Sequence, residues 1–153
     1  MTAGVVGATG ATGATGTANL AGYAYIYNLT PQVVPVGAAV TFDSNGPELG
    51  IIHVPGTSSV VVTSSGTYLV NFSVSGVEPN QFALFVNGVV DPASVYGSGA
   101  GTQQNNGQVI LTLNAGDVLQ LVNNTSAAAV TLQALAGGTQ SNVSASLVIE
   151  QLG

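Results

Sequence analysis

The chain has 153 residues, with no lysine or arginine, six acidic residues and a formal net charge of −6. Nucleic-acid binding requires cationic side chains that displace counterions from phosphates, so this composition predicts no nucleic-acid partner. The chain also lacks cysteine, which excludes disulfides, thiol catalysis and cysteine-ligated metal sites.

The first 18 residues have a period of three. Glycine stands at positions 4, 7, 10, 13 and 16, and a collagen triple helix needs glycine at every third position because only hydrogen fits at the three-chain axis. A flexible Gly/Ala/Thr linker is the alternative. Thr9, Thr12 and Thr15 each occupy the third position of a triplet, where their hydroxyl groups would form an outward row available to O-linked sugar. We therefore predict a collagen-like segment over residues 1–18 and a separate domain over residues 19–153.

The second domain has the pattern of an all-β protein. Short runs rich in β-branched and aromatic residues recur between Gly, Pro, Asn and Ser, and no window shows a helical period. Asn87-Gly88 between two apolar runs predicts a tight hairpin, and residues 114–117 predict another. About ten short antiparallel strands at this spacing indicate a sandwich or jelly roll. The predicted strands cover residues 23–27, 51–54, 60–63, 67–75, 82–86, 89–90, 109–113, 118–122, 130–135 and 143–150.

Alternation along three of these strands leaves one set of side chains facing away from the expected core. The chain is 46% hydrophobic, yet it has no run of the roughly 20 apolar residues that a membrane-spanning helix needs. We therefore expect no membrane insertion and predict that such faces are buried against other subunits. A position in the core is the alternative for the tyrosines of this set. The candidate contact residues are Tyr23, Tyr25, Tyr27, Leu69, Asn71, Val118, Gln120 and Val122.

The sequence offers little to catalysis. His53 is the only histidine, and a Ser-His-Asp arrangement would need Asp43 or Asp117 beside it. The chain has no Gly-x-Ser-x-Gly elbow, and residues 51–54 have the pattern of a strand, so His53 is interpreted as a packed or interfacial residue. One histidine and scattered carboxylates match no zinc or EF-hand spacing. We predict no enzymatic activity, no cofactor and no metal site.

The order of several short motifs resembles a known family. Behind the glycine triplets come Gly22-Tyr-Ala-Tyr25, Gly66-Thr-Tyr-Leu-Val-Asn-Phe72 and Phe85-Val-Asn-Gly88, then the hairpin of residues 109–121 and a closing strand over residues 144–150. This order resembles the C-terminal domains of Bacillus collagen-like spore-surface glycoproteins of the BclA type. More distantly, it resembles the complement-type and tumour-necrosis-factor-like jelly rolls.

The resemblance implies a homotrimer of ten-stranded jelly rolls that aligns three chains into a triple helix on the spore surface, in the exosporium nap. It also implies O-glycosylation of Thr9, Thr12 and Thr15, although the triplets lack the proline usual in this family. Some complement-type heads hold calcium near the trimer axis, and three copies of Asp117 or Asp43 are the candidates here. For Asp117 the alternative is a carboxylate that caps its own hairpin turn.

A second hypothesis comes from a different class of function. The polar stretch 97–107 is long and glycine-rich, and it has the pattern of an exposed loop. Such loops would suit an adhesin that binds a host receptor or a glycan. Sugar binding usually needs an aromatic ring beside polar groups, and only Tyr96 adjoins this stretch.

Overall fold

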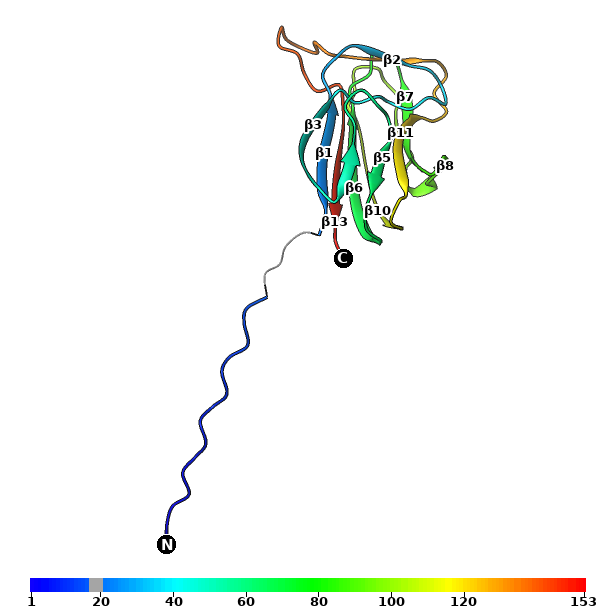
Figure 1. The fold of residues 1–153 in the computed structure, drawn as a ribbon. Coiled ribbons are helices and arrows are strands. Elements are labelled where there is room, and N and C mark those ends of the chain that lie inside the picture. Colours follow the sequence, from blue (N-terminus) through cyan, green and yellow to red (C-terminus); the bar gives the residue numbers. More distant parts are fainter. Residues whose placement is uncertain (17–20) are drawn as a thin grey trace.

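A computed structural model of the chain describes residues 1–16 and 21–153. Residues 21–153 form a sandwich of antiparallel sheets, and residues 1–16 extend away from one end of it (Figure 1). The predicted all-β fold is confirmed. The predicted boundary between residues 18 and 19 lies outside the described residues. Within the described part of the chain, no helix has the length and apolar character needed to cross a membrane.

The first sheet has five strands in the order β10-β6-β13-β1-β3, and every neighbouring pair is antiparallel. The C-terminal strand β13 lies at its centre and pairs with β6 on one side and β1 on the other. The strands are β1 (Tyr23–Asn28), β3 (Ser44–Leu49), β6 (Gly66–Val74), β10 (Asn105–Leu113) and β13 (Ala145–Gln151).

The second sheet follows the order β4-β5-β11-β7-β8, with β9 also paired to β7. A separate two-stranded sheet of β2 and β12 lies at the end of the sandwich far from the N-terminus (Figure 1). The elements are β2 (Gln32–Val34), β4 (Ile51–His53), β5 (Val60–Val62), β7 (Asn80–Val86), β8 (Val89–Val90), the 3-10 helix η1 (Pro92–Ser94), β9 (Tyr96–Ser98), β11 (Val118–Asn123) and β12 (Val130–Leu132).

The core lies between the two large sheets and is built by strand alternation. In β6, the predicted inward residues Tyr68, Val70, Phe72 and Val74 are all at most 3% exposed. In β13, Leu147 and its alternate neighbours also face the core and are buried, and burial alternates along the whole strand. Each such side chain contributes roughly 1.5–3 kcal/mol through burial. The sandwich is therefore held together without any lysine or arginine to form ion pairs.

Both predicted hairpin turns are present. Asn87 and Gly88 have φ angles of 51° and 80°, as a type I′ turn requires. In the second turn, the backbone N–H of Asn114 donates to Asp117 Oδ2 at 2.8 Å, so Asp117 caps its own turn. Asn87 Nδ2 donates to Asp117 Oδ1 at 2.9 Å and thereby joins the two turns.

Three strands were not predicted, and each has a local reason. β3 contains Asn45-Gly46-Pro47, which is typical of a turn, but proline is tolerated here because β3 is the edge strand of its sheet. β2 and β9 are only three residues long. Because β9 takes residues 96–98 and β10 begins at Asn105, the expected loop over residues 97–107 is wrong; the connection covers only residues 99–104.

Glu78 fastens the small β2–β12 sheet to the sandwich. Its carboxylate accepts the backbone N–H of Thr131 at 2.7 Å and the Thr131 hydroxyl at 2.9 Å. The backbone hydrogen bond from Thr131 is the main reason why the pKa of Glu78 lies below its usual value.

Two other carboxylates also have lowered pKa values. For Asp117, the N–H of Asn114 and then the Asn87 amide lower the pKa. Burial raises the pKa of Asp43, but hydrogen bonds from Ser44 and from Leu29 and Thr30 outweigh it and lower the pKa.

We expect acid to weaken the attachment of the β2–β12 sheet to the sandwich through Glu78. A carboxyl whose pKa is lowered by folding stabilises the folded state above its unfolded pKa, and this contribution disappears as the pH falls through the folded pKa. Glu78→Gln should lower the thermal midpoint at pH 7 by the equivalent of less than about 1 kcal/mol, because solvent screens a half-exposed carboxylate. Thermal scans between pH 7 and pH 3 should show the two proteins converging in the acid range. A constant difference at every pH would contradict the role of the Glu78 charge.

Candidate functional site

The outward face of the five-stranded sheet carries side chains in three register rows. Antiparallel pairing across β1, β13, β6 and β10 sets one residue of each strand beside the next. Because side chains alternate along a strand, every second residue of these strands shares this face. The rows are Tyr27, Ser146, Ser73 and Asn106; then Tyr25, Val148, Asn71 and Gln108; then Tyr23, Glu150, Leu69 and Ile110.

An aromatic stack borders the face along β1. The rings of Tyr25 and Tyr27 are stacked, with centroids 4.8 Å apart and an interplanar angle of 20°. Tyr25 also lies over Gly46 of the edge strand β3, where an added Cβ would come within 3.0 Å of Tyr25 Cδ1. Gly46 therefore lets the ring lie flat across the sheet. The alternative core position for these tyrosines is wrong, because Ala24 and Ile26 fill the interior instead.

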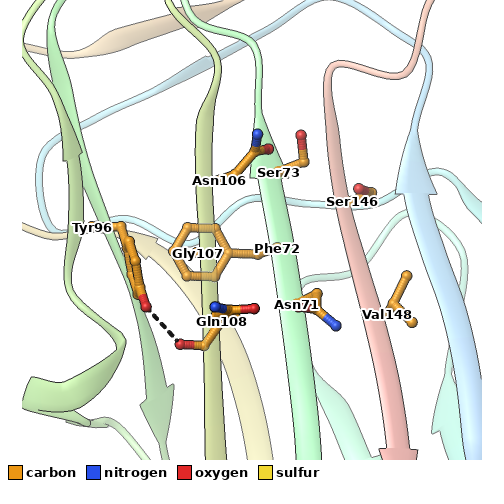
Figure 2. A pocket seen from close by; sticks show the side chains of 9 residues that line it. All are labelled: Asn71, Phe72, Ser73, Tyr96, Asn106, Gly107, Gln108, Ser146 and Val148. Carbon is orange, nitrogen blue, oxygen red and sulfur yellow. Dashed lines mark hydrogen bonds between the residues drawn. The ribbon is translucent and has the colours of Figure 1, made fainter.

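A hollow of about 430 Å³ opens between β10, β6 and β13 (Figure 2). Because Gly107 has no side chain on its inward side, the ring of Phe72 lies directly behind the Gly107 backbone. Tyr96 meets Phe72 edge-on at 5.9 Å and donates its hydroxyl to the backbone carbonyl of Gln108 at 3.0 Å. The polar lining comes from the side chains of Asn71, Ser73, Asn106, Gln108 and Ser146.

Two further hollows lie on the same face. One, of about 250 Å³, is bounded by Tyr23, Tyr25, Pro47 and Glu150, and another, of about 420 Å³, by residues of β6, β9 and β10. The side-chain amides of Asn71, Asn106 and Gln108 form no hydrogen bonds with other described residues. Among the residues of the three rows, Glu150 alone is charged. The face thus combines aromatic and apolar groups with neutral hydrogen-bonding groups.

The structure divides the predicted contact residues between two faces. Five of them lie together on the outward face of the five-stranded sheet: Tyr23, Tyr25, Tyr27, Leu69 and Asn71. The other three belong to β11 in the opposite sheet.

Within β11, Gln120 donates to Ser58 Oγ at 3.0 Å, and Val122 is only 3% exposed. β10 and β13 also contribute to the face, above all through Gln108 and Val148, which were not predicted from the sequence. Alternation in residues 109–113 and 143–150 was the available signal, but sheet order was needed to use it.

In the part of the chain that the structure describes, no aspartate is hydrogen-bonded to His53. Its ring contacts Asn45 Oδ1 and the carbonyl oxygen of Thr57. Asp43 instead accepts the N–H of Leu29 and the hydroxyl of Ser44, and Asp117 binds within its own turn. The Ser-His-Asp arrangement weighed above is therefore not formed by these residues. In the described ranges 1–16 and 21–153, no three His, Asp or Glu side chains gather as they would around a metal ion.

A family model described as the BclA C-terminal domain matches residues 24–153, which is most of the chain. The chain belongs to the BclA C-terminal domain family. The resemblance found in the sequence is thereby confirmed over residues 24–153. No curated protein matches the chain.

Solved structures with low sequence identity share the fold of this BclA C-terminal domain. The globular domain of zebrafish complement 1qA protein has a TM-score of 0.65 at 13% identity, over 86% of this chain and 97% of that chain. Eiger TNF from S. frugiperda has a TM-score of 0.63 at 14% identity, over 86% and 92%. Murine APRIL has a TM-score of 0.56 at 12% identity, over 86% and 98%. The predicted complement- and TNF-like jelly roll is confirmed.

Proposed function

We propose that this BclA C-terminal domain is the non-catalytic, homotrimeric head of a collagen-like filament on the spore surface. Its role is to bring three chains together in register, so that the glycine triplets of residues 1–18 wind into a triple helix. Starting such a helix is slow for free chains because all three must meet and align. A head that assembles first supplies a high effective concentration of the three strands.

The glycines of residues 1–16 carry the proposal. A Cβ added at Gly4, Gly7, Gly10, Gly13 or Gly16 would meet nothing within 4 Å. Packing inside one chain therefore gives no reason for glycine at every third position. Close approach of three chains around a common axis does give one.

The outward face of the five-stranded sheet is the surface we propose for trimer contact. It begins at Tyr23, the first residue of β1, and so lies next to the point where the N-terminal segment joins the sandwich (Figure 1). Its neutral amides and aromatic rings are suited to an interface, because they bring hydrogen bonds and apolar area without unpaired cations. Three copies around an axis would cover the hollows and set their N-termini side by side.

Membership of the BclA family supports a location on the spore surface, in the exosporium nap. Thr9, Thr12 and Thr15 are exposed, as O-glycosylation would require. The composition agrees with a display role, since a chain without lysine or arginine offers trypsin-like proteases no cleavage site.

Light scattering tests the proposal directly. The protein should have three times its chain mass at micromolar concentration, both intact and after removal of residues 1–18, because the contact surface lies in the sandwich. A monomer in both forms would overturn the proposal. A trimer that is lost on truncation would show that the N-terminal segment drives assembly and would overturn the role given to the head.

The adhesin alternative has less support from the observed geometry. The connection over residues 99–104 is short and carries no aromatic ring. The adjacent ring, Tyr96, is engaged with Phe72 and with the Gln108 carbonyl oxygen. Binding to a glycan array by the intact trimer would favour this second function.

A further inference from the structure

The outward face of the five-stranded sheet has two unlike halves. The aromatic stack of Tyr25 and Tyr27 lies on β1, and the ring of Tyr25 covers Gly46 of the edge strand β3. The hollow of about 430 Å³ opens at the other side, between β10, β6 and β13 (Figure 2). Because β13 and β6 separate β1 from β10, the stack and the far wall of the hollow are three strand spacings apart, about 14 Å. The stack of one chain therefore does not fill the hollow of the same chain.

The tyrosine hydroxyl groups differ in their hydrogen bonding. Those of Tyr68 in the core and Tyr96 beside the hollow each donate to a backbone carbonyl oxygen, at 2.8 Å and 3.0 Å. Among the residues that the structure describes, none is hydrogen-bonded to the hydroxyls of Tyr25 and Tyr27. A tyrosine hydroxyl usually has a hydrogen-bond partner when it is buried. A subunit that covers the stack must therefore bring polar groups to these two hydroxyls.

The hollow carries complementary groups. The side-chain amides of Asn71, Asn106 and Gln108 line it and form no hydrogen bonds with other described residues. An amide offers a carbonyl oxygen and N–H donors, so a phenol hydroxyl can donate to the one and accept from the other. The rings of Phe72 and Tyr96 provide an aromatic wall for a further ring. The volume of about 430 Å³ lies within the range of about 300–1,000 Å³ that is typical of sites enclosing a small organic group.

Rotation about an axis parallel to the strands sets one half of the face against the other. Residues 1–16 leave the sandwich at one end, so three such segments meet when the axis runs along the strands (Figure 1). Such a rotation keeps each register row at its own height, and Tyr25 of one chain then lies level with Asn71 and Gln108 of the next. Because the stack and the hollow lie on opposite sides of the face, each subunit presents its stack to the hollow of its neighbour. Contacts of this head-to-tail kind close into a ring.

We propose that the aromatic stack of each chain docks in the hollow of the next chain, three times around the trimer. The hydroxyls of Tyr25 and Tyr27 then bind the side-chain amides that line the hollow, and the rings pack beside Phe72. Each site is incomplete in a single chain, because the rings and the amides come from different subunits. Neutral groups suit this contact, since a chain without lysine or arginine cannot form side-chain ion pairs between subunits. The docking rests on the proposed trimer and specifies how its subunits are arranged.

Photo-cross-linking of the full chain tests the docking. Tyr27 is replaced by p-azidophenylalanine, which is close to tyrosine in size, and the protein is irradiated at micromolar concentration. We expect covalent dimers and trimers on a denaturing gel, with mass spectrometry placing the cross-links at residues 71–73 and 106–108 of another chain. The control carries the same amino acid at Phe85, a half-buried ring of β7 in the other sheet, and should give no covalent multimers.

Light scattering of the same samples separates the docking from the proposed function. A trimer that gives no cross-links, or cross-links that fall outside the hollow, would refute the docking and leave the trimeric head in place. A trimer whose hollow stays open and binds glycans on an array would refute it as well. A monomer or a dimer would overturn the proposed function, and the docking with it.

A double-mutant cycle gives an independent test. Tyr25→Phe removes one hydroxyl and should raise the trimer dissociation constant by about fivefold for each lost hydrogen bond, or about 100-fold for the three contacts of a trimer. In a background that carries Asn71→Leu and Gln108→Leu, the amides level with Tyr25 are already gone. Tyr25→Phe should have almost no effect there, because both sets of changes remove the same contacts. An equal effect of Tyr25→Phe in both backgrounds would refute the docking.

Discussion

Replacing Val148 by aspartate is expected to convert the proposed trimer into monomers. Val148 lies half-buried on β13, in the middle row of the proposed contact face, between Tyr25 and Asn71. A trimer would bury three new carboxylates, and the chain has no lysine or arginine to pair with them. Burial of an unpaired charge costs several kcal/mol per ion, and one trimer would bury three of them. Sedimentation or light scattering at micromolar concentration measures the result.

Ile52→Asp is the matched control. Ile52 is 54% exposed on β4, in the opposite sheet, so the same change adds the same charge to a surface we assign no contact. This variant should remain trimeric. Asn71→Asp provides a second variant on the contact face that adds the charge with almost no change of shape, and it should also weaken the trimer. Trimers of normal stability from both Val148→Asp and Asn71→Asp would show that the subunits meet elsewhere.

Gly107→Ala should destabilise the fold strongly, because the added methyl group points into the core beneath the proposed contact face. The added Cβ would lie 2.1 Å from Cζ and 2.3 Å from Cε1 of Phe72, so the ring must leave its place. Displacing it also breaks the edge-on contact with Tyr96. Overpacking of this kind costs about 3 kcal/mol, which corresponds to a fall of about 6–12 °C in the thermal midpoint for a chain of this size.

Gly138→Ala serves as the control for this change, because a Cβ there meets nothing within 4 Å. It should alter stability by no more than about 0.5 kcal/mol. Combining Gly107→Ala with Phe72→Leu should cost less than the sum of the two single changes, since the smaller side chain makes room. Equal stability of the Gly107→Ala and Gly138→Ala proteins would contradict the packing described here.

Strand alternation in the sequence was enough to predict much of the interior. The faces of β6 were assigned correctly because a buried strand with one solvent face leaves a period of two, as Tyr68 and Phe72 show. The two hairpin turns were also predicted, because positive φ restricts residue choice at Asn87 and Gly88. These features depend on neighbours close in sequence.

The missed elements depend on tertiary contacts. β3 looks like a turn, and it becomes a strand because β1 pairs with it and Tyr25 covers Gly46. The contact face could be predicted only in part for the same reason: alternation shows that Leu69 and Val118 point away from the core, but not that they lie on opposite sheets. His53 was interpreted as packed or interfacial and is buried, yet its partner Asn45 comes from that unexpected strand.

The C-terminus is fixed at the same end of the sandwich as the N-terminal segment (Figure 1). The carbonyl oxygen of Gly153 accepts the N–H of Thr67 at 2.7 Å, and a Cβ at Gly66 would lie 2.4 Å from that oxygen. Gln151 donates its backbone N–H to Gly22 at 2.8 Å. A peptide or enzyme fused after Gly153 would therefore sit against the base of the head, underneath rather than outermost. Cargo meant for display belongs in the connection between β12 and β13, which projects from the opposite end and has an open site at Gly138.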